Sequence, residues 1–565
     1  MTAKRALTPL ALLLALTMIA AACSGSTDTE ASDGQTETGE ESTEASGATD
    51  AEASLPDVEE EAMEDEEEAM EDEEAMEDDS AGFDAVAGDE AARVTSAADS
   101  AEADGGFFPE PVEPEPDIDD PSGQFQDYGI RPFVETSVDP LSTFALDVDT
   151  ASYSIAREFL VNGSLPPRES VRVEEYVNSF DYDYRAPSEG LNVQADGGPS
   201  PFDQDNVIVR VGVQAEQVAN ADRPDASLTF VVDTSGSMDR QNRLELVKSS
   251  LSQLARELGR NDSVAIVTYG DTARVILPPT AANDIDTILD AIDSLRTDGS
   301  TNVEAGLQVG YDLANESFLD GGINRVVLAS DGVANVGLVD PDGLASLIMG
   351  DADRGIHLVT VGVGLGDFND VLLEQLANQG DGFYAYVNDE AEASRLFGDE
   401  LVSTLLTVAI DGKIQVEFDE NVVEQYRLIG FENRAVLDDD FRNDAVDAGE
   451  LGAGHQVTAL YELTLRPGVD AGDQLGVVQL RWEDPEERNV RETRLALTAA
   501  IIEDRWNDTA DDFRLAVTAA AFAEILRDSP YRGDVSFDQV ADEAGALGSG
   551  SAAELADLAR LASFG

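Results

Sequence analysis

Strand-like and helix-like segments alternate strictly between residues 227 and 408, and this alternation constrains the fold more than any other feature. Short apolar runs such as 228–232 are typical of buried parallel strands, because protein covers both of their faces. Amphipathic helical segments separate these runs, and the one at 243–258 carries an apolar stripe. The succession predicts a doubly wound α/β domain with a mostly parallel sheet.

Oxygen-bearing side chains follow the strand at 228–232 at once. Asp233, Ser235 and Ser237 alternate along the next turn, and Gly236 lets the backbone bend between them. In open α/β sheets, ligands bind beyond the carboxyl ends of the strands. Hard cations such as Mg2+ take oxygen ligands in near-octahedral geometry. The turn therefore predicts a metal site, although the same residues could also cap the helix that follows.

Two later stretches complete the pattern. Thr301 lies in a Gly-Ser-Thr-Asn loop before a helical segment, and Asp331 follows a second apolar run at 325–329. In this order, the three stretches resemble the metal-ion-dependent adhesion site of von Willebrand factor A (VWA) domains. The resemblance implies that the two serines and the threonine face the metal, while the two aspartates act mainly through water. The implied metal residues are Asp233, Ser235, Ser237, Thr301 and Asp331.

The chain begins with a pattern that is typical of secretory signals. Lys4 and Arg5 precede an apolar run at 6–22, and Cys23 follows three alanines. This start resembles bacterial lipoprotein signals, which implies a cleaved signal peptide at 1–22 and lipidation of Cys23. The apolar run is too short for a lasting membrane span. We therefore expect a protein that is lipid-anchored to the cell membrane on its extracytoplasmic side.

An acidic, low-complexity segment comes next. Arg93 is the only basic residue between 24 and 120, and Ala-Met-Glu-Asp recurs three times from residue 62 to residue 78. Such a segment cannot bury enough apolar surface to offset its ordering entropy. We therefore expect a disordered linker over 23–124, which serves either as a tether or as a solubilising tail.

The charge of the whole chain excludes some classes of partner. It has 34 basic and 117 acidic residues, which give a formal net charge of −83. Nucleic-acid phosphates and anionic lipid surfaces both require a basic face. We therefore expect no nucleic-acid partner, and contact with the membrane only through the lipid anchor.

The segments that flank the VWA region carry a further resemblance. The stretches 140–154, 165–180, 426–434 and 447–461 resemble a family of bacterial VWA-containing lipoproteins, often described as calcium-activated chloride channel homologues. We expect the VWA domain to be inserted in, or flanked by, a β-sandwich that includes the alternating segment at 207–213. The expected parts are an N-terminal family domain (125–226), the VWA domain (227–408), a β-rich domain (409–502) and a helical end (503–565) with helices at 511–527 and 552–561.

A second turn, at 148–152, matches the metal-site pattern less well. Ala151 there stands where the first metal-binding serine of a VWA site would be. We therefore favour a helix N-cap, formed by Asp149 or Ser152, over a second metal site at this turn.

No catalytic constellation is recognisable in the sequence. His357 in an apolar strand and His455 in a Gly-rich loop are both typical of structural residues. A serine triad would need one of these histidines near a serine elbow, and no phosphate-binding Gly-x-x-x-x-Gly-Lys-Ser/Thr loop occurs. Acidic residues are plentiful, so a carboxylate-based hydrolase stays open, but nothing singles out a pair. We expect a protein that is not an enzyme.

The predicted metal site favours binding. Neutral hydroxyl ligands leave an ion most of its positive charge, so its open position should prefer a carboxylate from a partner protein. We therefore predict a cell-envelope module that binds an acidic residue of a partner through a divalent cation, Mg2+ ahead of Mn2+ or Ca2+. The alternatives are a metal-stabilised scaffold in the envelope and, less favoured, a channel-associated subunit.

Overall fold

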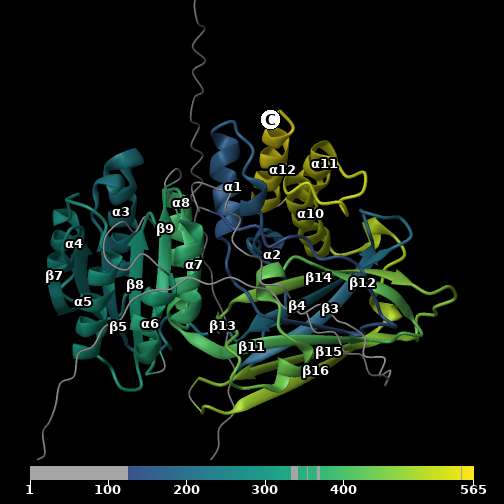
Figure 1. Ribbon diagram of the computed structural model, residues 1–565, viewed down its shortest axis with the longest axis horizontal. Helices are drawn as coiled ribbons and strands as arrows, with labels where there is room; N and C mark the ends of the chain where they lie inside the picture. Colours follow the sequence, from purple (N-terminus) through teal and green to yellow (C-terminus); the bar gives the residue numbers. More distant parts are fainter. Residues whose placement is uncertain are drawn as a thin grey trace, which may run out of the picture. The chain divides into compact units, whose positions relative to one another are not determined.

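The computed structural model describes residues 125–332, 341–352, 354–364, 369–485, 487–548 and 550–564. Three β-sheets and the helices that cover them make up this part of the chain (Figure 1). The predicted signal peptide, Cys23 and the acidic segment lie outside the described residues. None of the helices in these ranges combines the length and the apolarity that a membrane crossing requires.

The first sheet has six strands in the order β10-β9-β8-β5-β6-β7. Neighbouring strands run parallel, except that β7 pairs antiparallel with β6 at the edge. The two middle strands, β5 and β8, are buried along their whole length. This arrangement confirms the predicted doubly wound, mostly parallel sheet. Its strands are β5 (Ala226–Asp233), β6 (Ser263–Tyr269), β7 (Arg274–Ala281), β8 (Ile323–Ser330), β9 (Ile356–Val363) and β10 (Phe383–Val387).

Helices cover both faces of this sheet, because successive side chains of a strand point to opposite faces. Phe230 and Val232 of β5 pack in one core with Leu244, whereas Val231 packs in another core with Leu307. The first core includes α3 (Arg243–Glu257) and α4 (Ile285–Ser294), and the second includes α5 (Val303–Glu316), α6 (Pro341–Ala352) and α7 (Asp370–Gln379). Two short helices, α8 (Glu390–Ser394) and α9 (Leu401–Leu405), lead out of the domain.

Two antiparallel sheets form a sandwich, whose strands come from segments before and after the VWA region in the sequence. Val211 and Tyr461 of one sheet and Val416 and Val478 of the other belong to one buried core. The first sheet has the order β1-β12-β14-β4-β3, and the second has the order β13-β11-β15-β16, with β2 paired to β11. The strands are β1 (Val134–Glu135), β2 (Leu141–Ala145), β3 (Leu191–Pro199), β4 (Val207–Ala215), β11 (Thr407–Phe418), β12 (Val423–Ile429), β13 (Gly449–Gly452), β14 (Gln456–Leu465), β15 (Gln474–Glu483) and β16 (Val490–Thr498).

The pairing of β4 with β14 shows that the VWA domain is inserted in the sandwich. Val211 of β4 lies opposite Ala459 of β14, and all six strands of the VWA sheet, β5 to β10, come between them in sequence. The prediction that 207–213 is a strand of the sandwich is therefore confirmed.

Helices cover the outer face of the sheet that contains β4 and β14. Ile208 and Leu460 point from this sheet into a core that they share with Phe513, Phe522 and Leu555. The helical end is confirmed, although the sequence analysis missed its middle helix, α11. The helices of this layer are α1 (Ala151–Val161), α2 (Val173–Asn178), α10 (Asp511–Leu526), α11 (Phe537–Leu547) and α12 (Gly550–Ala562).

Candidate metal centre

The ends of two neighbouring parallel strands place two aspartates at one edge of the VWA sheet. Strand β5 ends at Asp233, β8 ends at Ser330, and Val232 lies opposite Ala329 in the register. The Ser330 hydroxyl donates a hydrogen bond to Asp233 Oδ2 at 2.8 Å. Asp233 and Asp331 are both 0% exposed. The carboxyl ends of β5 and β8 therefore bring two buried carboxylates to the same edge.

The turn after β5 aligns the two serines. The Ser235 amide donates to Asp233 Oδ1 at 2.8 Å, which bends the chain back over the end of the strand. The hydroxyl oxygens of Ser235 and Ser237 lie 2.9 Å apart. Ser235 is buried and Ser237 is partly exposed, so this pair of hydroxyls leads from the buried aspartates toward solvent.

The loop that carries Thr301 is held against this turn by backbone hydrogen bonds. The Gly236 amide donates to Gly299 O at 3.1 Å, and the Asp298 amide donates to Thr234 O at 2.5 Å. Thr301 itself is 1% exposed. Gly299 has a φ of +82°, and a Cβ there would lie 2.8 Å from Asp271 Cγ, so the loop needs glycine at this position. The structure thus places the loop of Thr301 beside the turn of Ser235 and Ser237.

The two buried aspartates carry an excess of negative charge. Burial, and then the charge of Asp331, raise the pKa of Asp233 to about 6. Asp331 Oδ2 accepts a hydrogen bond from Arg243 Nη1 at 2.8 Å. Asp331 Oδ1 is buried and has no hydrogen-bond partner within the described ranges. A sheet edge with neutral hydroxyls and an unpartnered carboxylate oxygen fits a hard divalent cation, whose preferred ligands are oxygens.

Arg243 is the residue of this site that the sequence analysis missed. It is the first residue of α3 and is 3% exposed, with its guanidinium against the Asp331 carboxylate. A basic residue at a helix start carries no signal of this contact in the sequence. The pairing depends on α3 crossing the carboxyl edge of β8.

The turn at 148–152 differs from the prediction. Helix α1 has Thr150 as its N-cap residue, and no side chain caps the helix. Asp149 Oδ1 accepts from the Tyr384 amide at 3.0 Å, and Asp149 Oδ2 accepts from Arg434 Nη2 at 2.9 Å. The predicted N-cap by Asp149 or Ser152 is therefore wrong, because tertiary contacts use these side chains. With both oxygens of Asp149 occupied, the turn also offers no free carboxylate for a metal.

Both histidines are neutral and half-buried. Burial, and then the charge of Arg325, lower the pKa of His357 to about 3. Burial, and then the charges of Arg395 and Arg325, lower the pKa of His455 to about 4. His455 Nδ1 accepts from the Gly452 amide at 3.0 Å, which fixes the neutral tautomer with its proton on Nε2. This environment is typical of structural histidines.

Family models match nearly the whole described chain. They are the von Willebrand factor model at residues 120–210, the von Willebrand factor type A domain at 227–399 and the C-terminal region of uncharacterized protein YfbK at 403–563. None of these descriptions names a reaction, a lipid anchor or a chloride channel.

Individual proteins are also similar to this chain. The chain is 35% identical over 445 residues to the uncharacterized protein YfbK of Escherichia coli K12, which covers 74% of this chain and 76% of the relative. It is 24% identical over 307 residues to the uncharacterized protein sll0103 of Synechocystis, and the match covers 52% of this chain and 70% of the relative. A solved von Willebrand factor type A protein from Catenulispora acidiphila is 16% identical and covers 65% of this chain and 89% of its own, with a TM-score of 0.40. The chain belongs to the YfbK-like family of VWA-domain proteins.

Proposed function

We propose that this chain is a cell-envelope lipoprotein that binds a partner protein through a divalent cation at the carboxyl edge of its VWA sheet. The hydroxyls of Ser235, Ser237 and Thr301 would hold the ion, and Asp233 and Asp331 would act mainly through water. An acidic side chain of the partner would complete the site. Mg2+ is the favoured ion, ahead of Mn2+ and Ca2+.

One observation carries most weight. Asp331 Oδ1 is buried and has no hydrogen-bond partner in the described part of the chain. The charge of the same carboxylate also raises the pKa of buried Asp233. Leaving a charged oxygen buried without a partner costs several kcal/mol by order of magnitude. An ion-bound water directed at Asp331 would supply the missing donor. This is the role that the VWA resemblance gives to the aspartates.

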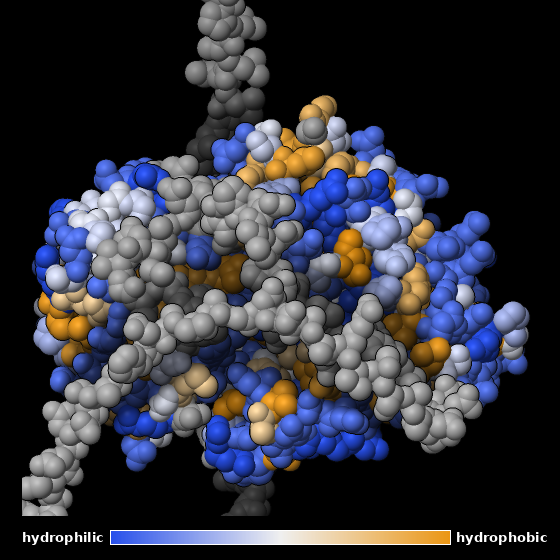
Figure 2. Space-filling view, viewed as in Figure 1, coloured by the Kyte–Doolittle hydropathy of each residue, from blue (hydrophilic) through white to orange (hydrophobic). Residues whose placement is uncertain are grey.

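The chemistry of the ligands favours binding to a carboxylate. Three neutral hydroxyls would cancel none of the charge of the ion, so a partner carboxylate would gain more here than at a site with carboxylate ligands. Ser237 is partly exposed, so the hydroxyl side of the site is open to a partner. On the face drawn in Figure 2, described surface residues are mostly hydrophilic and hydrophobic ones gather in small separate groups. A charge-assisted contact suits such a surface.

The proposed location rests on the pattern of residues 1–23. Lys4, Arg5, the apolar run at 6–22 and Cys23 have the order of a lipoprotein signal. Attachment through Cys23 would hold the VWA domain on the extracytoplasmic side of the membrane, with the acidic segment between them. Metabolic labelling with a fatty-acid analogue tests this part, and labelling that persists in Cys23→Ser would contradict it.

Crosslinking in intact cells tests the binding function. A photo-reactive amino acid at Asp239, which is exposed two residues after Ser237, should capture the partner in Mg2+ and lose it in EDTA. Ser235→Ala should abolish capture, whereas Ser249→Ala makes the same change on the exposed side of α3 and should preserve it. Capture by Ser235→Ala at the wild-type level, with a lowered melting temperature, would instead support the metal-stabilised scaffold.

A further inference from the structure

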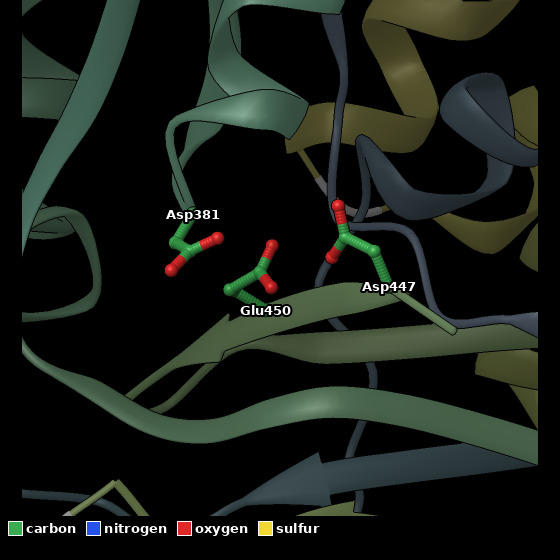
Figure 3. Close-up of side chains that lie close together, drawn as sticks. All are labelled: Asp381, Asp447 and Glu450. Atoms are coloured by element: carbon green, nitrogen blue, oxygen red, sulfur yellow. The ribbon is translucent and has the colours of Figure 1, made fainter. Parts of the chain in front are cut away.

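Three carboxyl groups from two domains meet at the other edge of the VWA sheet. Asp381 lies in the turn between α7 and β10, before the amino end of a parallel strand, whereas Asp233 follows a carboxyl end. Asp447 and Glu450 belong to the sandwich, at the entry to β13 and within it. One carboxylate oxygen from each residue lies within 4.8 Å of the others. Figure 3 shows the Glu450 carboxyl between those of Asp381 and Asp447.

Glu450 has a buried oxygen that lacks a partner. The residue is 8% exposed, and its Oε1 has no hydrogen-bond partner among the described residues. Burial, and then the charges of Asp447 and Asp381, raise the pKa of Glu450 well above its ordinary range. The carboxyl points into the cluster (Figure 3). A buried, unpartnered oxygen that faces two further carboxylates indicates a missing ligand.

The basic side chains of this region are bound to other acceptors. Lys413 Nζ donates to the backbone carbonyls of the 443–446 loop. Arg434 pairs with buried aspartates of the 147–149 segment. Arg325 donates to a backbone carbonyl of α9 and to a threonine of β11. Within the described ranges, neither carboxylate of the sandwich forms an ion pair. Arg434 and Arg325 interact with Glu450, and Lys413 with Asp447, only through their charge at longer range.

We propose that Asp381, Asp447 and Glu450 bind a Ca2+ ion that fastens the VWA domain to the β-sandwich. Ca2+ takes six to eight oxygens at about 2.3–2.6 Å and tolerates irregular geometry, so opposite ligands lie about 4.6–5.2 Å apart. Mg2+ requires near-octahedral geometry at about 2.1 Å, which brings opposite ligands to about 4.2 Å. Three oxygens within 4.8 Å of one another can all reach one Ca2+ ion, and carboxylates from two domains do not have to meet the regular geometry that Mg2+ requires.

This second site is independent of the proposed adhesion site. Its ligands come from β13, from the residues just before it and from the turn after α7. Three carboxylates would already bind the ion and offset its charge, so it would have little attraction left for a partner carboxylate. The ion would join Asp381 to residues at least 66 positions later in the sequence, and so would hold α7 and β10 against the sandwich.

Hydrogen–deuterium exchange of the full chain with Ca2+ alone tests the proposal, because it reports on each segment separately. In Ca2+ at ten times its dissociation constant, peptides over 380–387 and 445–452 should exchange about tenfold more slowly than in EDTA, since ligand binding suppresses local opening in this proportion. The acidic segment at 24–120 lies in other peptides, so any Ca2+ that it binds does not enter the comparison.

Two variants and one control complete the experiment. Glu450→Gln should abolish the protection, and so should Asp447→Asn, which changes an exposed residue. Both variants should keep the far-ultraviolet circular dichroism spectrum of the wild type. Glu417→Gln makes the same charge change at an exposed position of β11 and should keep the protection from exchange. Protection that survives both substitutions, protection that is absent from the wild type, or protection by Mg2+ but not by Ca2+ would overturn the proposal.

Discussion

Arg243 Nη1 donates to Asp331 Oδ2 at 2.8 Å, and both side chains are buried at the carboxyl edge of the VWA sheet. The guanidinium is therefore a positive charge built into the candidate metal centre. It partly neutralises a carboxylate that would otherwise be buried beside Asp233 without a counter-charge. The same contact also fixes the orientation of Asp331, so that its second oxygen is left for another donor.

Removing this arginine should make the protein depend on its metal. Arg243→Gln leaves Asp331 as an uncompensated buried charge, which costs about 3–5 kcal/mol of unfolding free energy in EDTA. Saturating Mg2+ should restore part of the loss, and so should stabilise the variant more than the wild type. Urea denaturation in EDTA and in Mg2+ measures both effects. Arg240→Gln makes the same change at an exposed position nearby. If this control lost as much unfolding free energy in EDTA as Arg243→Gln, the account would be contradicted.

Losing one hydroxyl should weaken the binding of the ion. Changes even to outer-shell partners cost about 10–100-fold in metal affinity, so Ser235→Ala should weaken Mn2+ binding at least tenfold. Ser249→Ala should bind Mn2+ like the wild type. Electron paramagnetic resonance of free Mn2+ gives the affinities. Equal affinities for the two variants would remove Ser235 from the metal site.

The position of Thr301 should depend on Gly299. Gly299→Ala would place a Cβ 2.8 Å from Asp271 Cγ and would strain a residue whose φ is +82°, so the loop must move. We expect Mn2+ affinity to fall by tenfold or more in the folded variant, by the same titration. Gly163→Ala has a comparable φ of +80° and meets no atom within 4 Å, so it should lower stability slightly and leave Mn2+ affinity unchanged.

Local patterns in the sequence were sufficient for the sheet and for the placement of two predicted site residues at one edge of it. Buried strands that end in polar turns place Asp233 and Asp331 at one edge, because parallel strands share their direction. The alternation of 207–213 likewise identified β4, whose partner β14 comes more than 240 residues later. Helix α11 was missed, although the capping box of Ser536 and Gln539 marks its start.

Contacts between distant elements could not be predicted in this way. The sequence predicts that Asp149 could cap a helix. In the structure, its two oxygens instead accept hydrogen bonds from the Tyr384 amide of β10 and from the Arg434 guanidinium. Arg243 meets Asp331 only because α3 crosses the edge of the sheet. Asp381 and Glu450 come together through the docking of two domains, and acidic residues are too common in this chain to single them out.

The half-buried imidazole of His455 should make stability fall in acid. Its pKa of about 4 lies below the ordinary value of 6.5, so the unfolded chain takes up a proton first as the pH falls. The stability that the neutral form contributes is complete above pH 6.5 and is lost progressively toward pH 4. Between pH 7 and pH 5 the wild type should lose about 1–2 kcal/mol relative to His455→Gln. Parallel stability–pH curves for the two proteins, from urea denaturation, would contradict this.

The most direct test of the central claim is the affinity for the partner that crosslinking identifies, measured by isothermal titration calorimetry in Mg2+ and in EDTA. If a divalent cation bridges the hydroxyl site and a partner carboxylate, EDTA should weaken binding about 30-fold or more, since a bridging contact of this kind is worth about 2 kcal/mol or more. Ser235→Ala in Mg2+ should weaken it to the same extent. Undiminished affinity in EDTA would contradict the account.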